Sequence, residues 1–186
     1  MRRVARAASR PGSGTGRPAG YVVIRGPLGV GKTTVARILA RTRGAGYVSI
    51  DQILDDHGLW DSGRLAEFLA ANRVAVGIAR PLLAAGTAVV FDGNFYWKRQ
   101  LDDLIGRLSY PHQVFTLQAP VALCILRDRR RRPSHGAIAA RQVYAKATRF
   151  EYGISVDATG SLAAVVRRIE RQLPGVLRVR PTAPTG

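Results

Sequence analysis

The sequence predicts an α/β protein with a parallel sheet and helices on both of its faces. Two observations predict this fold: five short runs rich in β-branched and aromatic residues, and helical patterns that separate them. Because parallel strands are joined by long crossovers, strands that alternate with helices favour βαβ units. A chain of 186 residues, 46% of them apolar, can bury one sizeable core, so we expect one domain.

The expected elements follow one another without an internal repeat or a heptad pattern. We expect strands at residues 21–25, 47–51, 88–91, 113–117 and 154–157. We expect helices at residues 32–43, about 63–83, 98–108, 121–130 and 162–172, with a further helical stretch that contains Arg141 and Lys146. In the last helix the apolar residues recur at helical spacing, which is typical of a helix with one face on a core.

The two ends of the chain differ from the central part. Residues 1–20 hold five arginines, no acidic residue and a segment rich in Gly, Pro and Ser, so we expect a disordered basic tail. The kinds of residue in its first part resemble a transit peptide, but no apolar stretch follows as in a secretory signal. We therefore predict a domain at residues 21–174 and a second flexible tail at 175–186.

Apolar runs and cysteine content exclude several classes of protein. The longest apolar runs are far shorter than the roughly 20 residues that cross a bilayer, so we expect no membrane insertion. Cys124 is the one cysteine of the sequence, which leaves no intrachain disulfide, zinc cluster or Cys-x-x-Cys pair. These features predict a cytoplasmic protein.

The net charge of +17 is concentrated in a few segments. The two tails carry seven net positive charges, residues 127–149 carry another seven, and only three remain for the rest of the chain. Such a distribution suits an anionic phosphate ligand better than a groove that follows a nucleic-acid backbone. Contact between the basic tails and RNA remains open as the less favoured alternative.

A phosphate-binding motif follows the first expected strand. The sequence GPLGVGKT matches G-x-x-x-x-G-K-[ST] without a gap and precedes an expected helix, which is the context that the motif requires. Glycines let backbone N–H groups approach a phosphate, and the helix N-terminus attracts negative charge. The expected ATP-binding residues are Gly26, Leu28, Gly29, Val30, Gly31, Lys32, Thr33 and Thr34. Lys32 is also expected to act in catalysis on the β- and γ-phosphates, and the Thr33 hydroxyl to bind Mg²⁺.

Three aspartates are expected at the carboxyl ends of strands, where ligands bind in open α/β sheets. Asp92 follows the third strand and is expected to hold Mg²⁺ or one of its waters. Asp51 is expected to end the second strand, where it would accept a proton from an acceptor hydroxyl. The alternative for Asp51 is a cap of a helix that begins near Gln52. Asp157 is expected to be structural or part of the rim around the base.

An arginine-rich segment at residues 127–132 falls at the end of the helix that follows the fourth expected strand. Dense arginines suit a lid that closes over a triphosphate, because they neutralise charge in phosphoryl transfer and help to exclude water. At a spacing of four, Arg127 and Arg131 are expected to share a helix face and to be the catalytic pair. A solvated helix face is the alternative for any single arginine. His135 is expected to cap or to form hydrogen bonds.

Together these motifs resemble the P-loop kinases that include zeta toxins, chloramphenicol phosphotransferase, gluconate kinase and, more distantly, adenylate kinase. The similar segments, between residues 21 and 173, are GPLGVGKTT, YVSIDQIL, AVVFDGNFY, FTLQAPVALCILRDRRRR and YGISVDATGS. The resemblance implies a P-loop NTPase fold with strand order 2-3-1-4-5 and an arginine-rich lid. It also implies that Asp51 activates the acceptor hydroxyl and that Arg127 acts with Arg131 or Arg132.

The sequence as a whole predicts a kinase that transfers the γ-phosphoryl group of Mg-ATP to a hydroxyl of a small-molecule acceptor. Residues 55–80 and the turn at 94–99 match no particular member of the group, so they do not name the acceptor. That turn pairs aromatic with basic residues, which keeps a nucleotide or RNA-end kinase as an alternative. A nucleotide-dependent binding switch with slow ATPase activity is the third hypothesis. The oligomeric state is not predicted.

Overall fold

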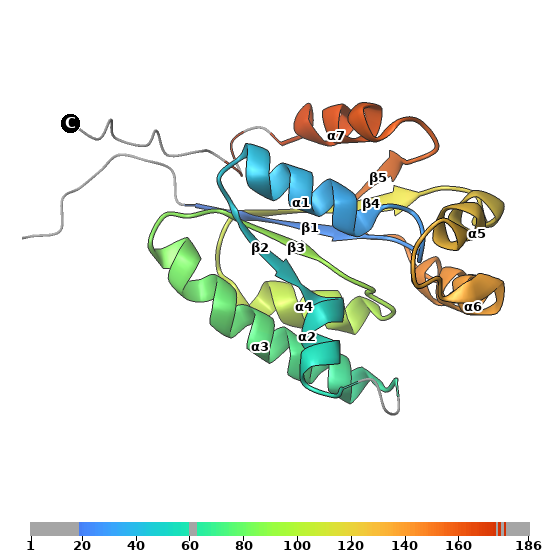
Figure 1. Ribbon diagram of the computed structural model, residues 1–186. Coiled ribbons are helices and arrows are strands. Elements are labelled where there is room, and N and C mark those ends of the chain that lie inside the picture. The colour runs from blue at the N-terminus through green and yellow to red at the C-terminus, as the bar shows by residue number, and fades with distance from the viewer. Residues whose placement is uncertain (1–18, 60–62, 174, 176, 178–186) are drawn as a thin grey trace, which may run out of the picture.

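The structure of the chain is a computed structural model that describes residues 19–59, 63–173, 175 and 177. Five parallel strands form one sheet in the order β2-β3-β1-β4-β5 (Figure 1). The strands are β1 (Tyr21–Arg25), β2 (Gly46–Ser49), β3 (Val89–Asp92), β4 (His112–Gln118) and β5 (Ile154–Asp157). The α/β fold class and the strand order are as predicted. The tails predicted at 1–20 and 175–186 lie almost wholly outside the described residues, and the domain boundaries remain a prediction.

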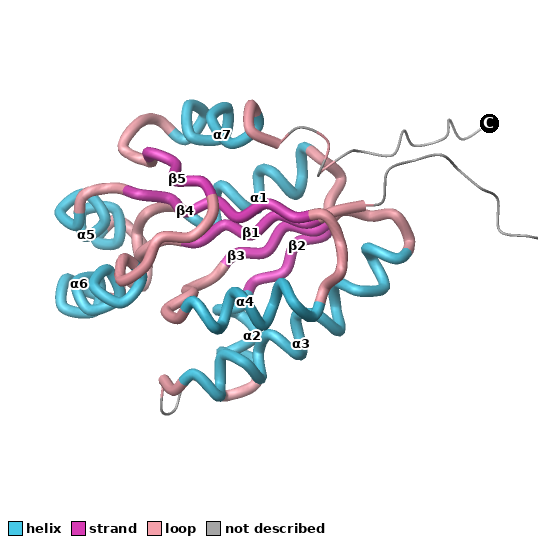
Figure 2. The backbone as a smooth tube through the Cα atoms, turned by 180° about the vertical axis from the view of Figure 1, so that it is seen from behind, coloured by secondary structure: helices cyan, strands magenta, loops and turns pink. Residues whose placement is uncertain are grey.

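Helices cover both faces of the sheet and the ends of its strands. They are α1 (Lys32–Thr42), α2 (Ile50–Asp56), α3 (Leu65–Ala84), α4 (Lys98–Arg107), α5 (Val121–Arg129), α6 (Gly136–Ala147) and α7 (Leu162–Glu170). α1 and α7 lie on one face, α3 and α4 lie on the other, and α5 and α6 pair beyond the carboxyl ends of the strands (Figures 1 and 2). No helix of the described residues is long and apolar enough to span a membrane.

The sheet separates two apolar cores. Tyr21 and Val23 of β1 pack into the cluster under α3 and α4, whereas Val22 and Ile24 pack into the cluster under α1 and α7. Successive strand residues point to opposite faces, so a strand that is covered on both sides must be apolar at every position. Residues 21–24 of β1 therefore form a continuous apolar run that ends one residue before the start of the phosphate motif at Gly26, with Arg25 between them.

The second strand ends earlier than the sequence predicted. It stops at Ser49, and α2 begins at Ile50 because the Ser49 hydroxyl accepts a hydrogen bond from the backbone N–H of Gln52 at 3.3 Å. Asp51 consequently lies in the first turn of α2, where the helix dipole favours a carboxylate. The expectation that Asp51 ends the strand is wrong, and so is the alternative that Asp51 caps this helix.

β1 ends on an arginine that is 0% exposed. The Arg25 guanidinium donates hydrogen bonds to the Thr116 hydroxyl and to the carbonyl oxygens of Ala147, Phe95 and Phe150. It also lies 4.3 Å from the centre of the Phe150 ring, and burial lowers the pKa of Arg25 to about 10. Arg25 thus ties the end of α6 and the loop after β3 to the residue that precedes the phosphate motif.

Candidate active site

The loop from β1 to α1 needs glycine at two positions where its backbone lies close to the backbone of other segments. Gly26 has φ 146°, and a Cβ there would lie 2.6 Å from the Leu117 carbonyl oxygen. Gly29 has φ 79°, and a Cβ there would collide with the Cys124 carbonyl group at α5. Both backbone angles are in the region that side chains disfavour, so glycine is required for the loop to wrap the helix N-terminus.

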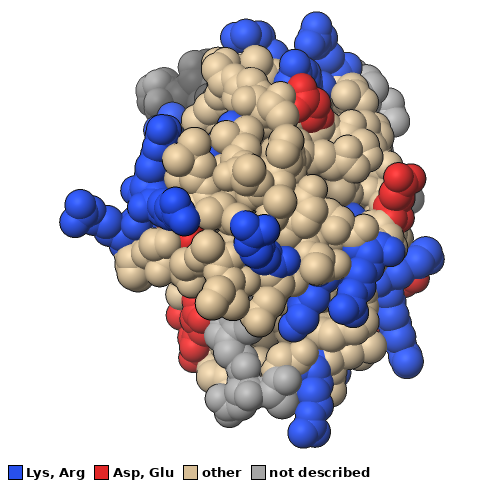
Figure 3. All heavy atoms as spheres, turned by 90° about the vertical axis from the view of Figure 1, so that its right-hand side faces the viewer, with Lys and Arg blue, Asp and Glu red and all other residues tan. Residues whose placement is uncertain are grey.

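A cavity of about 350 Å³ opens at the N-terminus of α1. We call it the phosphate cavity; it is lined by Gly29, Gly31, Lys32, Thr33, Thr34, Arg37, Arg127 and Arg131. The structure therefore brings the phosphate motif and both predicted lid arginines to one hollow. Lys and Arg side chains predominate over Asp and Glu on the face of the molecule at the α5–α6 end (Figure 3). Such a hollow suits a triphosphate.

The two lid arginines are held differently. Arg127 donates to the Ala158 carbonyl oxygen at 2.9 Å and to the Val30 carbonyl oxygen at 3.4 Å, so it joins α5 to the phosphate loop. Arg131 lies beyond α5, which ends at Arg129. The expectation that Arg127 and Arg131 share one helix face is therefore wrong. The chain turns after the helix, and this turn directs Arg131 to the same cavity.

Asp128 organises the turn into α6. Its buried Oδ2 accepts hydrogen bonds from the Ser134 hydroxyl at 2.8 Å and from the backbone N–H groups of His135 and Gly136 at 3.0 Å. The His135 side chain makes no capping hydrogen bond to α6. Sequence reasoning missed Asp128 because one acid among many arginines suggests only a compensating charge.

Asp92 and Thr33 lie in contact. The Thr33 hydroxyl donates to Asp92 Oδ2 at 2.7 Å, and the Tyr47 hydroxyl donates to Asp92 Oδ1 at 2.8 Å. Asp92 is 0% exposed. The burial of the Tyr47 hydroxyl and, after it, the negative charge of Asp92 raise the pKa of Tyr47 to about 12. Sequence reasoning missed Tyr47. Its contact with Asp92 depends on the register of β2 beside β3, in which Ser49 pairs with Asp92.

This cluster is the place where Mg²⁺ would fit. A hydroxyl and a carboxylate are the hard oxygen donors that Mg²⁺ takes, usually from one or two protein groups with phosphates and waters as the rest. No group of three or more His, Cys, Asp or Glu side chains that could hold a metal occurs within the part of the chain that the structure describes. The oxygen donors of Thr33 and Asp92 thus fit a Mg²⁺ ion whose other ligands are nucleotide phosphates and waters.

Lys32 and Asp51 carry opposite charges, and each influences the pKa of the other. Lys32 is buried, its Nζ donates to the Pro27 carbonyl oxygen at 3.2 Å, and burial lowers its pKa against the opposing attraction of Asp51 and Asp92. Burial raises the pKa of Asp51, while Lys32 and the Asn94 backbone N–H oppose that rise. A carboxyl group with a raised pKa is suited to accept a proton.

Asn94 fixes the orientation of Asp51. Its backbone N–H donates to Asp51 Oδ1 at 2.8 Å, and its side-chain Nδ2 donates to Asp51 Oδ2 at 3.1 Å. The carboxylate of α2 is thus attached to the loop that follows β3. In the sequence Asn94 follows Asp92 by two residues, but nothing in the motif showed that it forms hydrogen bonds with Asp51.

A second cavity of about 550 Å³ adjoins the phosphate cavity. We call it the acceptor cavity; it is lined by Leu28, Lys32, Thr33, Arg37, Tyr47, Ser49, Asp51, Gln52, Asp55, Asn94, Tyr96, Arg131, His135, Ala139 and Val143. The two cavities share Lys32, Thr33, Arg37 and Arg131. A phosphate chain in the first cavity would therefore end at the mouth of the second, which contains Asp51.

A third hollow of about 350 Å³ continues from the phosphate cavity toward β5 and α7. It shares Gly31, Thr34 and Arg127 with the phosphate cavity and is otherwise lined by apolar residues and by the loop after β5. Asp157 does not line it. The Asp157 carboxylate accepts from the Thr159 N–H and hydroxyl within its own turn, and this favours the structural role over the rim.

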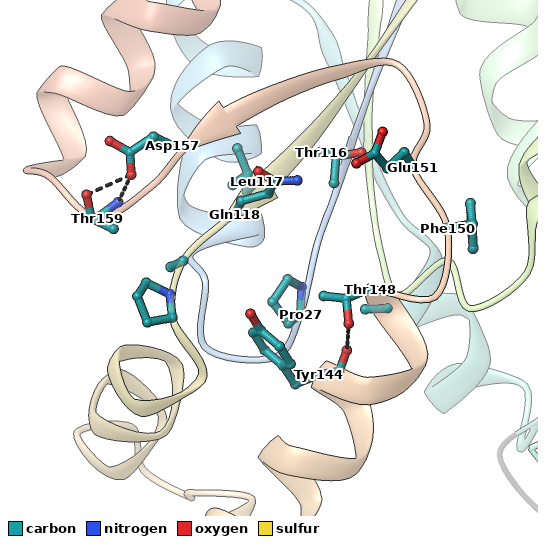
Figure 4. Close-up of a pocket in the computed structure, with 13 residues that line it drawn as sticks. Pro27, Thr116, Leu117, Gln118, Tyr144, Thr148, Phe150, Glu151, Asp157 and Thr159 are labelled. Carbon is teal, nitrogen blue, oxygen red and sulfur yellow. Dashed lines mark hydrogen bonds between the residues drawn. The ribbon is translucent and has the colours of Figure 1, made fainter.

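A separate cavity of about 520 Å³ lies between β4 and the end of α6 (Figure 4). Gln118 comes from β4, whereas Tyr144 comes from α6 and Thr148 and Glu151 from the chain that follows it. Asp157 lines this cavity, but none of the residues expected to bind ATP or Mg²⁺ or to act in catalysis does. The residues expected to act on a nucleotide therefore gather in the phosphate and acceptor cavities instead.

Comparison with known proteins identifies the family. A family model described as an AAA domain, AAA_33, matches residues 22–151, which is most of the chain. The chain belongs to this family. The AAA_33 match and the solved structures below confirm the resemblance to P-loop kinases that the motifs predicted. A search of curated proteins finds no match to the sequence.

Solved structures share the fold of this AAA_33 chain at low sequence identity. A gluconokinase from Sinorhizobium meliloti 1021 is 20% identical with a TM-score of 0.62, covering 84% of this chain and 97% of the other. A sugar kinase from Janibacter sp. HTCC2649 is 17% identical with a TM-score of 0.66, covering 88% and 100%. The Mycobacterium tuberculosis APS kinase, in complex with AMPPNP and APS, is 16% identical with a TM-score of 0.68, covering 84% and 98%.

Proposed function

We propose that this chain is a kinase that transfers the γ-phosphoryl group of Mg-ATP to a hydroxyl group of a small-molecule acceptor. The observation that carries the proposal is the junction of the two cavities. Lys32 and Arg131 line both cavities, and Asp51 lies on the acceptor side of them. A γ-phosphate and an attacking hydroxyl would meet beside a cation and a carboxylate, which is the arrangement that phosphoryl transfer needs.

The proposed reaction assigns one role to each side of the junction. The acceptor hydroxyl gives its proton to Asp51 as its oxygen bonds to the γ-phosphorus, and the bond from that phosphorus to the β–γ bridging oxygen breaks to release ADP. Lys32 and Arg131 stabilise the negative charge on the transferred group and on the leaving oxygen. Asn94 holds the Asp51 carboxylate in place through its two hydrogen bonds.

Thr33 and Asp92 would hold Mg²⁺. When bound, Mg²⁺ neutralises charge on the phosphates and helps to orient them. The Thr33 hydroxyl could keep its proton toward Asp92 while a lone pair of its oxygen binds the metal, and the Tyr47 hydroxyl donates to the other carboxylate oxygen. Tyr47 is therefore a positioning residue for Asp92.

The solved structures support a small-molecule acceptor. Those with this fold include a sugar kinase and a shikimate kinase in complex with shikimate. The acceptor cavity of this chain, at about 550 Å³, suits an acceptor of comparable size. We also propose a cytoplasmic location, because the one cysteine, Cys124, is free and buried.

An RNA-end kinase is less favoured by the structure of the turn after β3. Phe95 is 1% exposed and Tyr96 is 9% exposed, and Tyr96 and Trp97 stack edge-to-face with Phe68 in the core. Base stacking needs aromatic faces that are open to a ligand. The aromatic residues of this turn thus pack in the core rather than offer faces to bases. The RNA-end alternative is now supported only by the charge of the basic tails.

The proposal is tested by ADP release from Mg-ATP with and without a panel of small hydroxylated acceptors. We expect acceptor-dependent ADP release, a phosphorylated product by mass spectrometry, and loss of both with a chelator. ATP hydrolysis that no acceptor changes would instead support a nucleotide-dependent switch. Phosphorylation of short RNA at two salt concentrations, without any small product, would support the RNA-end alternative.

A further inference from the structure

Asn94, which lines the acceptor cavity, has one polar atom without a hydrogen-bond partner among the described residues. Asn94 is 7% exposed and lines the cavity, and its Nδ2 donates to Asp51 Oδ2. Because carboxylate oxygens only accept hydrogen bonds from N–H groups, this contact keeps the amide nitrogen toward Asp51 and leaves Asn94 Oδ1 on the other side. That oxygen is buried without a hydrogen bond to any residue that the structure describes. It calls for a hydrogen-bond donor.

A free carboxylate lies one helical turn from Asp51. Asp51 and Asp55 are four residues apart on α2, and both line the acceptor cavity. Asp55 is near enough to contribute to the raised pKa of Asp51. No ion pair or side-chain hydrogen bond of Asp55 occurs within residues 19–59 and 63–173. The α2 side of the cavity therefore presents unpaired acceptor oxygens.

The cations of the acceptor cavity are all on its other side. Lys32, Arg37 and Arg131 also line the phosphate cavity, so a triphosphate would occupy their charge. The described residues that line the α2 side, chiefly Gln52, Asp55 and Tyr96, include no lysine or arginine. A carboxylate or phosphate group on the acceptor would need such a partner, because Arg and Lys are the side chains that bind these groups.

We propose that the acceptor is a donor-rich polyol that carries an amine, such as an amino sugar or aminocyclitol, and no carboxylate or phosphate group. This rests on the proposed kinase function and concerns the same site. One hydroxyl lies at Asp51 and reacts, a second donor satisfies Asn94 Oδ1, and the ammonium group pairs with Asp55. Leu28 and Val143 offer apolar surface to the C–H face of the ring.

Two sets of compounds matched in skeleton test this class. The first set is D-gluconate, D-glucitol and D-glucamine, and the second is quinate, myo-inositol and 2-deoxystreptamine. Binding to the full chain is measured by calorimetry with Mg²⁺ and a non-hydrolysable ATP analogue, and phosphorylation is measured with ATP. We expect the amine to bind most tightly and the acid most weakly in each set. Tighter binding of the acid, or binding of no compound, overturns the assignment.

Two variants of α2 test whether Asp55 is the group that binds the amine. Asp55→Asn should weaken binding of the amine compounds by about fivefold and leave the neutral compounds unchanged. Asp56→Asn is the matched control, because Asp56 is the next residue of α2 and does not line the cavity. It should change neither.

The outcomes separate this inference from the proposed function. Amine compounds that bind in the expected order but receive no phosphoryl group would contradict the kinase and leave the ligand class standing. Phosphorylation of gluconate or quinate in preference to the amines would leave the kinase standing and overturn the ligand class. Equal losses from Asp55→Asn and Asp56→Asn would also overturn it, because only net charge would then matter.

Discussion

The nucleotide side and the acceptor side of the site are built in different ways. The nucleotide side is a run of consecutive residues, 26–34, between one strand and one helix. The acceptor side is assembled from α2, the end of β2, the loop after β3 and α6, which are distant in the sequence. The first side is shaped mainly by glycines and backbone N–H groups, whereas the second side is shaped by hydrogen bonds between individual side chains. Catalysis should depend on both, but substrate choice only on the second.

The largest effect is expected on the side that is built from the motif. Lys32→Ala should lower turnover by about 10³-fold or more and weaken ATP binding, because the phosphates lose a buried cation. ADP release with a phosphorylated product measures it. Lys98→Ala is the control, since Lys98 is exposed on α4 and pairs with Asp102 at 3.0 Å. Unchanged turnover in Lys32→Ala would remove the motif from the mechanism.

A smaller effect is expected where the two sides meet. Arg131→Ala should lower turnover by about 10- to 100-fold and raise the apparent KM for ATP less, if Arg131 acts mainly on the transition state. Steady-state kinetics with varied ATP separate the two quantities. Arg129→Ala, an exposed arginine of α5 that lines neither cavity, should leave both unchanged. Equal losses from the two variants would mean that bulk charge alone is measured.

The smallest effect is expected at Tyr47, which would act through Asp92. Tyr47→Phe removes the hydrogen bond to Asp92 Oδ1 and keeps the ring that lies under Arg37. Loss of one hydrogen bond of about 1 kcal/mol should raise the Mg²⁺ concentration for half-maximal activity about fivefold. Titration of activity with Mg²⁺ at saturating ATP measures the change. A half-saturation that stays the same would show that Asp92 needs no support from Tyr47.

Features that depend on neighbouring residues, such as the strands and the phosphate motif, were predicted from the sequence. The apolar runs predicted all five strands, and the phosphate motif placed its glycines and Lys32 because those residues act through positions next to one another. The end of β2 was wrong by two residues, because the same letters, Ser49 to Asp51, fit a strand end as well as a capped helix. A short polar segment at such a boundary carries no periodicity that would decide between them.

Contacts between distant segments could not be predicted. The pairing of Asn94 with Asp51 and of Tyr47 with Asp92 depends on the register of β2 beside β3. Arg25 gave no sign that it is buried, because its partners are backbone carbonyl oxygens and one hydroxyl rather than an acid. The acceptor side consists mainly of such contacts, which is why the sequence left the acceptor open.

The central claim is that Asp51 takes the proton of the acceptor. Asp51→Asn keeps the size of the side chain and removes the base, so acceptor-dependent turnover should fall by roughly 10²- to 10⁴-fold while the affinity for Mg-ATP barely changes. One variant measured for ATP affinity by calorimetry and for turnover by ADP release tests the claim. Turnover equal to that of the unaltered chain would contradict the claim and, with it, the proposed kinase mechanism.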